Sequence, residues 1–278
     1  MIKVIATDMD GTFLRSTNTY NESRFDQLLT KMTEQGVRFV VASGNQYAQL
    51  RDFFPDKDDK ITYVSENGAL ITQGSWQMVM GAFTNETVQS ILTCLAEYET
   101  DGEQIELLLC GVKAAYIEQN ASQRFKEFAA IYYHALTFVD DFIAVPDDQI
   151  VKIALDVTLP NPRTLVDHLN DQLTGQIVAV SSGHGSIDIM VPGINKGTAL
   201  MHLLTQWQLS QHHLAAFGDS DNDTEMLALT PHSYAMNVHS DLIGATANHV
   251  IGSNETDAVL DQIAKILEVQ EGCHDSLS

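Results

Sequence analysis

The stretch that decides the fold is Ile2-Lys-Val-Ile-Ala-Thr-Asp8-Met-Asp10-Gly11-Thr12. Its first residues are mostly apolar, and they stop abruptly at an acidic turn that contains a glycine. Such a run predicts a strand that is buried on both faces, as in a parallel sheet. Ligands of parallel sheets bind just beyond the carboxyl ends of the strands. Asp8 and Asp10 stand at that end, so this turn is a candidate active site, although a simple polar turn would use the same residue types.

The charge of the chain limits the partners it can have. The chain has 278 residues, of which 15 are Lys or Arg and 37 are Asp or Glu, giving a formal net charge of −22. This charge opposes binding to nucleic acid and to anionic membranes. Any phosphate ligand must therefore be held by a local positive group, such as a metal ion or a lysine.

The cysteine spacing and the first residues indicate a cytoplasmic protein. Cys94, Cys110 and Cys273 are far apart and form no CxxC pair, which argues against a disulfide framework and against a zinc–thiolate site. The chain enters its first strand directly, without the basic and apolar segments of a signal peptide, and no apolar run approaches a membrane span. We therefore expect a cytoplasmic location and no membrane partner.

Alternating strands and helices predict an α/β fold. A helix is expected over residues 21–35 and strands over 37–42 and 61–64, followed by a hairpin over 69–80. Strand, helix, strand, helix and strand in this order are typical of a Rossmann-like parallel sheet.

The pattern changes near residue 83, where about one hundred residues of mixed helices and strands begin. A strand over 187–191 then marks a return to the sheet. This predicts a core formed by 1–82 and 187–278, with an inserted α+β cap domain over 83–186. Gly183-His-Gly185 precedes the return and is a candidate hinge.

A second acidic cluster has the same setting as the first. The apolar strand expected over 214–217 ends in Gly218-Asp219-Ser-Asp-Asn222-Asp223. If this strand lies beside the first one, Asp8, Asp10, Asp219 and Asp223 meet at one edge of the sheet. Carboxylates so close together raise one another's pKa values unless a cation lies among them, and oxygen ligands favour Mg²⁺.

The same loop has two other interpretations. One is a solvated loop that caps a helix, since Asp and Asn are good N-cap residues. The other is an EF-hand calcium loop, which requires Gly at position six and Glu at position twelve. Thr224 and Thr230 occupy those positions, so the EF-hand is excluded.

Two further strand-end elements are suited to a phosphate group. Ser43-Gly44 offers a hydroxyl and a backbone amide that a ligand can approach closely, and Lys196 offers a cation at the start of a helix. A serine turn and a surface lysine are the ordinary alternatives. Lys196 lacks the glycine-rich lead of a P-loop, so a Walker-type nucleotide site is not supported.

The four motifs, taken together and in this order, resemble those of the haloacid-dehalogenase-like phosphohydrolases. The likeness is to the Cof-type branch, which carries a large α/β cap after the third core strand, and within it to bacterial sugar phosphatases. It extends over essentially the whole chain. The resemblance implies a Mg²⁺-dependent phosphatase of small phosphorylated sugars. The matching segments are Asp8-Met-Asp10-Gly-Thr12-Phe-Leu14, Ser43, Lys196 and Gly218-Asp219-Ser-Asp-Asn222-Asp223.

The resemblance also implies a role for each residue. Asp8 would attack the phosphorus and form an aspartyl-phosphate, while Asp10 would protonate the leaving group and then activate a water. Mg²⁺ would be held by Asp8, by the backbone carbonyl of Asp10 and by Asp219. The remaining implied roles are orientation of a metal-bound water by Asp223 and binding of the phosphate by Ser43, Gly44, Lys196 and Asn222.

Asn45 departs from the family pattern, because many relatives have Arg after the Ser-Gly pair. The absence of that cation weakens the case for a second anionic group on the substrate and fits a neutral, hydroxyl-rich leaving group. Asn45 is therefore a candidate substrate-binding residue with a neutral side chain.

Two other functions would use the same residues. A phosphomutase or phosphotransferase would pass the phosphoryl group to a sugar hydroxyl. Related sugar phosphomutases usually carry their cap between the first and second core strands, where this chain has no room. A non-catalytic regulator that binds Mg²⁺ or phosphate would be expected to lack Asp10, which is present here.

Overall fold

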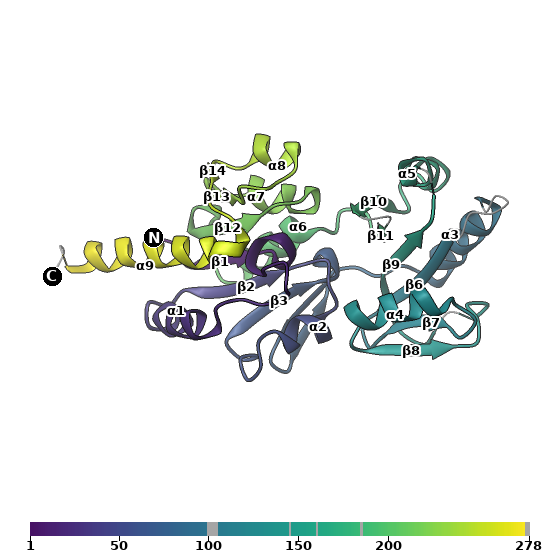
Figure 1. Ribbon diagram of the computed structural model, residues 1–278, viewed down its shortest axis with the longest axis horizontal. Helices are drawn as coiled ribbons and strands as arrows, with labels where there is room; N and C mark the ends of the chain where they lie inside the picture. The colour runs from purple at the N-terminus through teal and green to yellow at the C-terminus, as the bar shows by residue number, and fades with distance from the viewer. Residues whose placement is uncertain (99–104, 145, 160, 184–185, 276–278) are drawn as a thin grey trace. The chain divides into compact units, whose positions relative to one another are not determined.

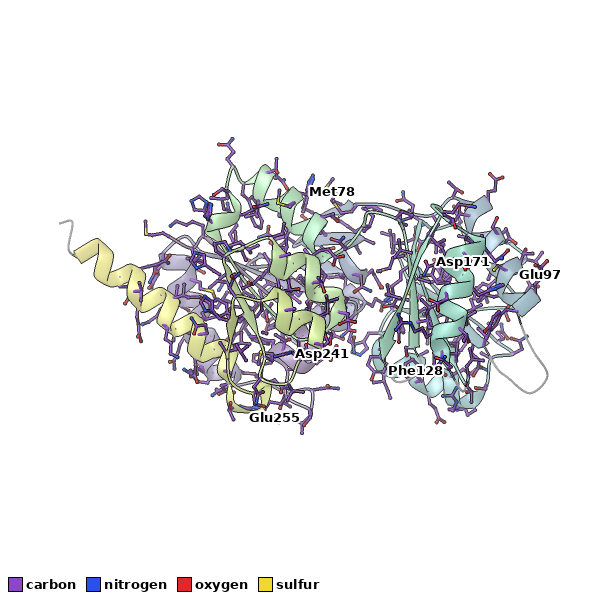
Figure 2. All side chains as sticks on the ribbon, turned by 90° about the horizontal axis from the view of Figure 1, so that it is seen from above. Met78, Glu97, Phe128, Asp171, Asp241 and Glu255 are labelled. Atoms are coloured by element: carbon purple, nitrogen blue, oxygen red, sulfur yellow. The ribbon has the colours of Figure 1, made fainter. Side chains whose placement is uncertain are left out.

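The computed structural model describes residues 1–98, 105–144, 146–159, 161–183 and 186–275 (Figure 1). The chain divides into two compact units. In Figure 2, Asp241 and Glu255 mark the first unit, and Glu97, Phe128 and Asp171 mark the second. The first unit comprises Met1–Gly44, Phe53–Gln77 and Asn195–Ser278, and the second comprises Asn45–Asp52 and Met78–Ile194.

A mostly parallel sheet forms the centre of the first unit. Its eight strands have the order β14-β13-β12-β1-β2-β3-β4-β5. β1 (Val4–Thr7) runs parallel to both β12 (Leu214–Gly218) and β2 (Arg38–Ala42), so the carboxyl ends of these three strands meet at one edge. All four residues of β1 are buried, as expected for a central parallel strand. The predicted parallel-sheet core is confirmed.

Helices cover this sheet in two groups. α1 packs against α9, while α6, α7 and α8 contact one another in turn. β4 and β5 form the hairpin that the sequence predicts. The remaining strands are β3 (Ile61–Ser65), β4 (Leu70–Gln73), β5 (Trp76–Val79), β13 (His232–Ala235) and β14 (His249–Val250), and the helices are α1 (Glu22–Glu34), α6 (Lys196–Gln206), α7 (Thr224–Ala228), α8 (Asp241–Thr246) and α9 (Ala258–Asp275).

Aromatic packing fixes the turn that follows β1. The Phe13 ring lies 5.1–5.8 Å, between ring centroids, from four other aromatic rings of the first unit. Such pairs contribute about 1 kcal/mol each beyond the area they bury. The chain is therefore held firmly three residues beyond Asp10. The four partners are Tyr20, Phe25, Phe39 and Phe54.

The second unit contains a six-stranded, mainly antiparallel sheet in the order β10-β11-β9-β6-β7-β8. Leu109 packs in an apolar cluster with residues of α3 and α5, whereas Leu108 packs with residues of α4. Because neighbouring residues of a strand point to opposite faces, α4 covers the face opposite α3 and α5. The elements are α2 (Tyr47–Asp52), α3 (Asn85–Tyr98), β6 (Ile105–Gly111), β7 (Ala115–Glu118), α4 (Gln123–Tyr132), β8 (Leu136–Val139), β9 (Ile150–Val157), α5 (Pro162–Gln172), β10 (Val178–Gly183) and β11 (Ser186–Met190).

The predicted domain boundary at residue 187 differs from the structure. The strand expected to return to the core is β11, which pairs antiparallel with β9 and β10 in the second sheet. The second unit continues to Ile194. The physical reason is that Ile187 and Ile189 are buried in the same apolar cluster as residues of α3 and α5.

Helix α2, which lies where the predicted order has its second helix, groups with the second unit. Gln46 exchanges two hydrogen bonds with the backbone of Ala135, its Nε2 donating over 3.0 Å and its Oε1 accepting over 2.8 Å. Gln49 Nε2 donates to the carbonyl oxygen of Ile131 over 3.1 Å. Asp52 Oδ2 lies 2.6 Å from His134 Nδ1. These side chains hold α2 and the residue before it against the end of α4 and the segment that follows it.

Other expectations concern cysteines, the hinge and membrane segments. Among the described residues, Cys94 and Cys110 are buried thiols; the side chain of Cys273 lies outside them. The hinge prediction involves residues 184–185, which also lie outside. In the described part of the chain, every helix is too short or too polar to cross a membrane.

Asp257, just before α9, joins distant parts of the first unit. Its carboxylate accepts hydrogen bonds from Arg15 Nη2 over 2.5 Å and from Asn21 Nδ2 over 2.9 Å. Burial alone would raise the pKa of Asp257, but the hydrogen bonds from Asn21 and Arg15 and the charges of Arg15 and Arg24 lower it below its ordinary value.

We expect Asp257→Asn to lower the free energy of unfolding by about 1 kcal/mol at pH 7. Because the folded-state pKa is the lower one, the carboxylate stabilises the fold above its unfolded-state pKa of about 3.9, and this contribution is lost as the pH falls through the folded-state pKa. Urea unfolding at stepwise lower pH should show the two proteins converging. Asn tolerates the φ of +57° at this position, so a difference that persists in acid would contradict the prediction.

Candidate active site

The turn after β1 is fastened to the end of β12. The Asp8 N–H donates to the carbonyl oxygen of Phe217 over 3.0 Å. Gly11 has a φ of +76°, and a Cβ at this position would lie 2.7 Å from Asp219 Oδ2. Only glycine fits both the backbone and the space. The two acidic segments therefore lie side by side, because β1 and β12 are neighbouring strands, which was the condition for the carboxylates to meet.

A fully buried lysine lies between two carboxylates. Lys196, at the start of α6, has 0% exposure, and its Nζ donates to Asp8 Oδ1 and to Asp223 Oδ1 over 2.7 Å each. The other oxygen of Asp223 accepts the backbone N–H groups of Asp219 over 3.0 Å and of Ser220 over 3.1 Å. Asp223 therefore fixes both the lysine and the acidic loop.

The pKa values of this cluster reflect burial and mutual charge. Burial raises the pKa of Asp8 well above its ordinary value; Lys196 opposes this, while the charges of Asp223, Asp219 and Asp10 add to it. Burial alone would lower the pKa of Lys196, but Asp223 and Asp8 raise it above its usual range. The lysine therefore stays charged, and the cluster holds more carboxyl groups than one ammonium group can pair with.

The excess of carboxylates fits a divalent cation. Asp8, Asp219 and Asp223 each offer a carboxylate oxygen, and these oxygens lie within 4.8 Å of one another. Such an all-oxygen set suits a hard ion such as Mg²⁺. Asp223 accepts hydrogen bonds from the buried ammonium group of Lys196 and from backbone N–H groups, whereas Asp219 accepts only from side-chain hydroxyl groups, which can rotate. Asp8 and Asp219 are therefore the residues best placed to be direct ligands.

Asp219 is oriented by two hydroxyl groups. Its Oδ1 accepts from Thr12 Oγ1 over 2.7 Å, and its Oδ2 accepts from Ser220 Oγ over 2.9 Å. Burial raises the pKa of Asp219, and the hydrogen bond from Thr12 only partly reverses this. Thr12 had no role assigned from the sequence, although it lies in the acidic turn two residues after Asp10.

Ser43 and Asn222 are linked through a residue that the sequence analysis did not select. Ser43, just beyond β2, donates its N–H to Val64 over 2.9 Å, and its carbonyl oxygen accepts the N–H of Asn67 over 3.0 Å. Asn222 Nδ2 donates to Asn67 Oδ1 over 3.0 Å. Asn67 follows the third strand of the sheet, so the polar strand-end signal that identified the other residues also applies to it.

Two predicted residues stand apart from this cluster. The Asp10 side chain is exposed and is not among the carboxylates grouped with Asp219; the contribution expected from its backbone carbonyl stays a prediction. Asn45 begins the segment that groups with the second unit, and its role in substrate binding also stays a prediction.

Gly44 lies against Asn67, whose Oδ1 would be 3.0 Å from a Cβ at that position.

Comparison with known proteins defines the class. The family model for haloacid dehalogenase-like hydrolases matches residues 5–263. The chain therefore belongs to the haloacid dehalogenase-like hydrolases, and its curated relatives place it among the phosphatases of that family. The predicted family membership is confirmed.

Three similar proteins show how far this likeness extends. The 5-amino-6-(5-phospho-D-ribitylamino)uracil phosphatase YbjI of Escherichia coli (strain K12) is 36% identical, over 96% of this chain and 97% of its own. A phosphatase of the same name, YitU of Bacillus subtilis (strain 168), is 20% identical over 92% and 94% of the two chains. The crystal structure of SMU.1108c from Streptococcus mutans UA159 is 36% identical, with a TM-score of 0.90 over 96% of this chain and 100% of that one.

The buried lysine leads to a stability prediction. Lys196→Met keeps the side-chain length but leaves Asp8 and Asp223 facing each other without a counter-charge, which should lower the free energy of unfolding by about 3 kcal/mol. Added Mg²⁺ should raise the melting temperature of this variant more than that of wild type. Lys265→Met, which removes an exposed lysine of α9, is the matched control. Equal melting temperatures for the two variants would contradict the prediction.

Proposed function

We propose that this protein is a Mg²⁺-dependent phosphatase that hydrolyses small phosphorylated metabolites through an aspartyl-phosphate on Asp8. The observation that carries the proposal is the contact of Lys196 Nζ with Asp8 Oδ1 over 2.7 Å. It places a permanent positive charge beside a buried carboxylate at the end of a parallel strand. A phosphoryl group transferred to that carboxylate would carry its negative oxygens next to the ammonium group.

The reaction divides into two displacements. In the first, an Asp8 oxygen forms a bond to phosphorus, the bond from phosphorus to the ester oxygen breaks, and Asp10 gives its proton to the leaving oxygen. In the second, Asp10 takes a proton from water as the water oxygen bonds to phosphorus. The bond to Asp8 then breaks and inorganic phosphate leaves. Two easier steps thus replace one difficult one.

The other residues of the site neutralise and orient the phosphoryl group. We assign hydrogen bonding of its oxygens to Ser43, to the Gly44 amide, to Lys196 and to Asn222. Mg²⁺ held by Asp8, the Asp10 carbonyl and Asp219 would supply further charge neutralisation at the phosphate. These assignments rest on the family motif together with the grouping of Asp8, Asp219 and Asp223.

The substrate class that we propose is a phosphate monoester on a polyhydroxylated carbon chain. Two relatives, at 36% and 20% identity, are named for a substrate with a phosphorylated ribityl chain. Sugar phosphates, the class suggested by the sequence resemblance, present the same kind of ester. Asn45 supplies no charge for a second phosphate. Sugar phosphates and phosphorylated ribityl compounds therefore both belong to the proposed substrate class.

The first test is phosphate release from p-nitrophenyl phosphate and from a panel of natural phosphate esters. We expect release by wild type with Mg²⁺, loss of release in EDTA, and a decrease of at least about 10⁴-fold in Asp8→Asn because the nucleophile is removed. Asp171→Asn, at an exposed position of the second unit (Figure 2), should retain full activity. A folded wild-type protein that binds Mg²⁺ but releases no phosphate would favour transfer to a sugar hydroxyl or a non-catalytic role.

A second test concerns Asn45. If its neutral side chain selects substrates with one anionic group, sugar monophosphates should exceed sugar bisphosphates by about tenfold in kcat/KM, which corresponds to 1.4 kcal/mol. Asn45→Arg should narrow this ratio by adding a cation. The measurement is kcat/KM for matched mono- and bisphosphates in both proteins. An unchanged ranking would remove Asn45 from the proposed binding site.

A further inference from the structure

The turn at the end of β3 has an unusual backbone. Glu66, Asn67 and Gly68 follow one another with φ values of +51°, +55° and +100°. A left-handed conformation is uncommon for residues other than glycine, and two of these three are not glycine. Glu66 and Asn67 are both buried, with 2% exposure each. Strain of this kind persists only where the surrounding structure maintains it, and it is concentrated at functional sites.

Contacts on both sides hold this turn in place. The Asn67 N–H donates to the Ser43 carbonyl oxygen over 3.0 Å. A Cβ on Gly68 would lie 2.2 Å from the backbone oxygen of Asn195, so the turn touches the residue that immediately precedes Lys196. The turn therefore lies directly between the Ser43-Gly44 loop and the start of the helix that carries the lysine.

The Asn67 side chain extends these contacts to the acidic loop. Its Oδ1 accepts the Nδ2 hydrogen of Asn222 over 3.0 Å. The same oxygen would be 3.0 Å from a Cβ on Gly44, so the amide lies against the backbone of the phosphate-binding loop. A single buried side chain thus contacts two segments that are 178 residues apart in sequence between Gly44 and Asn222.

We propose that Asn67 is a positioning residue that holds Asn222 and the Ser43-Gly44 loop in the arrangement needed to bind one phosphoryl group. The inference rests on the proposed phosphatase function and adds to it a residue outside the four segments on which the sequence resemblance rests. Asn67 acts through Asn222: its oxygen accepts one amide hydrogen and so fixes the direction of the Asn222 side chain. The loss of this hydrogen bond should raise the energy of the transition state, because the hydrogen-bond donors of Asn222 and of the Ser43-Gly44 loop must be aligned there with the phosphoryl oxygens.

The experiment is a double-mutant cycle on kcat and KM for p-nitrophenyl phosphate with Mg²⁺. Asn67→Gly keeps the left-handed backbone, which glycine adopts without strain, and removes the whole side chain with its amide. We expect kcat to fall about tenfold in Asn67→Gly and in Asn222→Ala, with a smaller change in KM. When Asn222→Ala is added to Asn67→Gly, kcat should fall further by less than about twofold, because the interaction between the two side chains is already lost.

A second background guards against a folding defect. Asn67→Asp keeps both the preference for the left-handed region and an oxygen that accepts from Asn222. The added charge changes the activity of Asn67→Asp itself, but adding Asn222→Ala to Asn67→Asp should still lower kcat by about tenfold. Asn18→Gly is the matched control, since Asn18 is exposed and also has a positive φ, +56°. Its kcat and melting temperature should equal those of wild type.

The possible failures are distinguishable. Wild type releasing phosphate, with Asn222→Ala lowering kcat by the same factor in wild type and in Asn67→Gly, would show that the positioning role is wrong. The phosphatase proposal would then stand. If Asn67→Gly retains wild-type kcat, the turn is structural only and the inference is overturned. If wild type itself releases no phosphate, the phosphatase proposal fails and this inference fails with it.

Discussion

Lys196 places a positive charge among the carboxyl groups of the candidate site. Its ammonium group bridges Asp8 after β1 and Asp223 after β12, two segments that the parallel sheet brings to one edge. A buried ion pair of this kind is weak support for stability, because desolvation offsets most of the Coulomb attraction. Its importance is geometric. The lysine fixes the start of α6, and Asp223 in turn fixes the backbone of the acidic loop.

Much of the first unit was predictable because its strands are short apolar runs that end at polar turns. β1 and β12 were recognisable from such runs, but their adjacency was only a condition for the carboxylates to meet, and the structure shows that it holds. β11 was assigned to the wrong sheet. Its apolar residues alternate in the same way in either sheet. Only their packing in one apolar cluster with residues of α3 and α5 shows that β11 belongs to the second sheet. A helix was expected where α2 lies, but its grouping with the second unit depends on hydrogen bonds from Gln46 and Gln49 to distant backbone groups, which the sequence does not reveal.

The candidate site was predictable to the extent that strand ends identify it. Asp8, Lys196 and Asp219 were selected from sequence, and the structure brings them together. Asn67 was not selected, since its importance comes from a left-handed backbone and from contacts with Ser43 and Asn222 that only the folded chain reveals. The structure also adds to what was expected of Asp223. Both of its oxygens are engaged by the protein, so it contributes first by holding Lys196 and the loop in place.

The grouping of Asn45–Asp52 with the second unit has a consequence for the modularity of this fold. A chimera that exchanged only Met78–Ile194 for the corresponding part of a relative would pair Gln46 and Gln49 with backbone groups whose positions are set by another protein's side chains. A small shift of that backbone would leave these buried amides without their hydrogen bonds. Recombination between relatives should therefore succeed when both segments are inherited together, so that two distant stretches of the gene behave as one evolutionary unit.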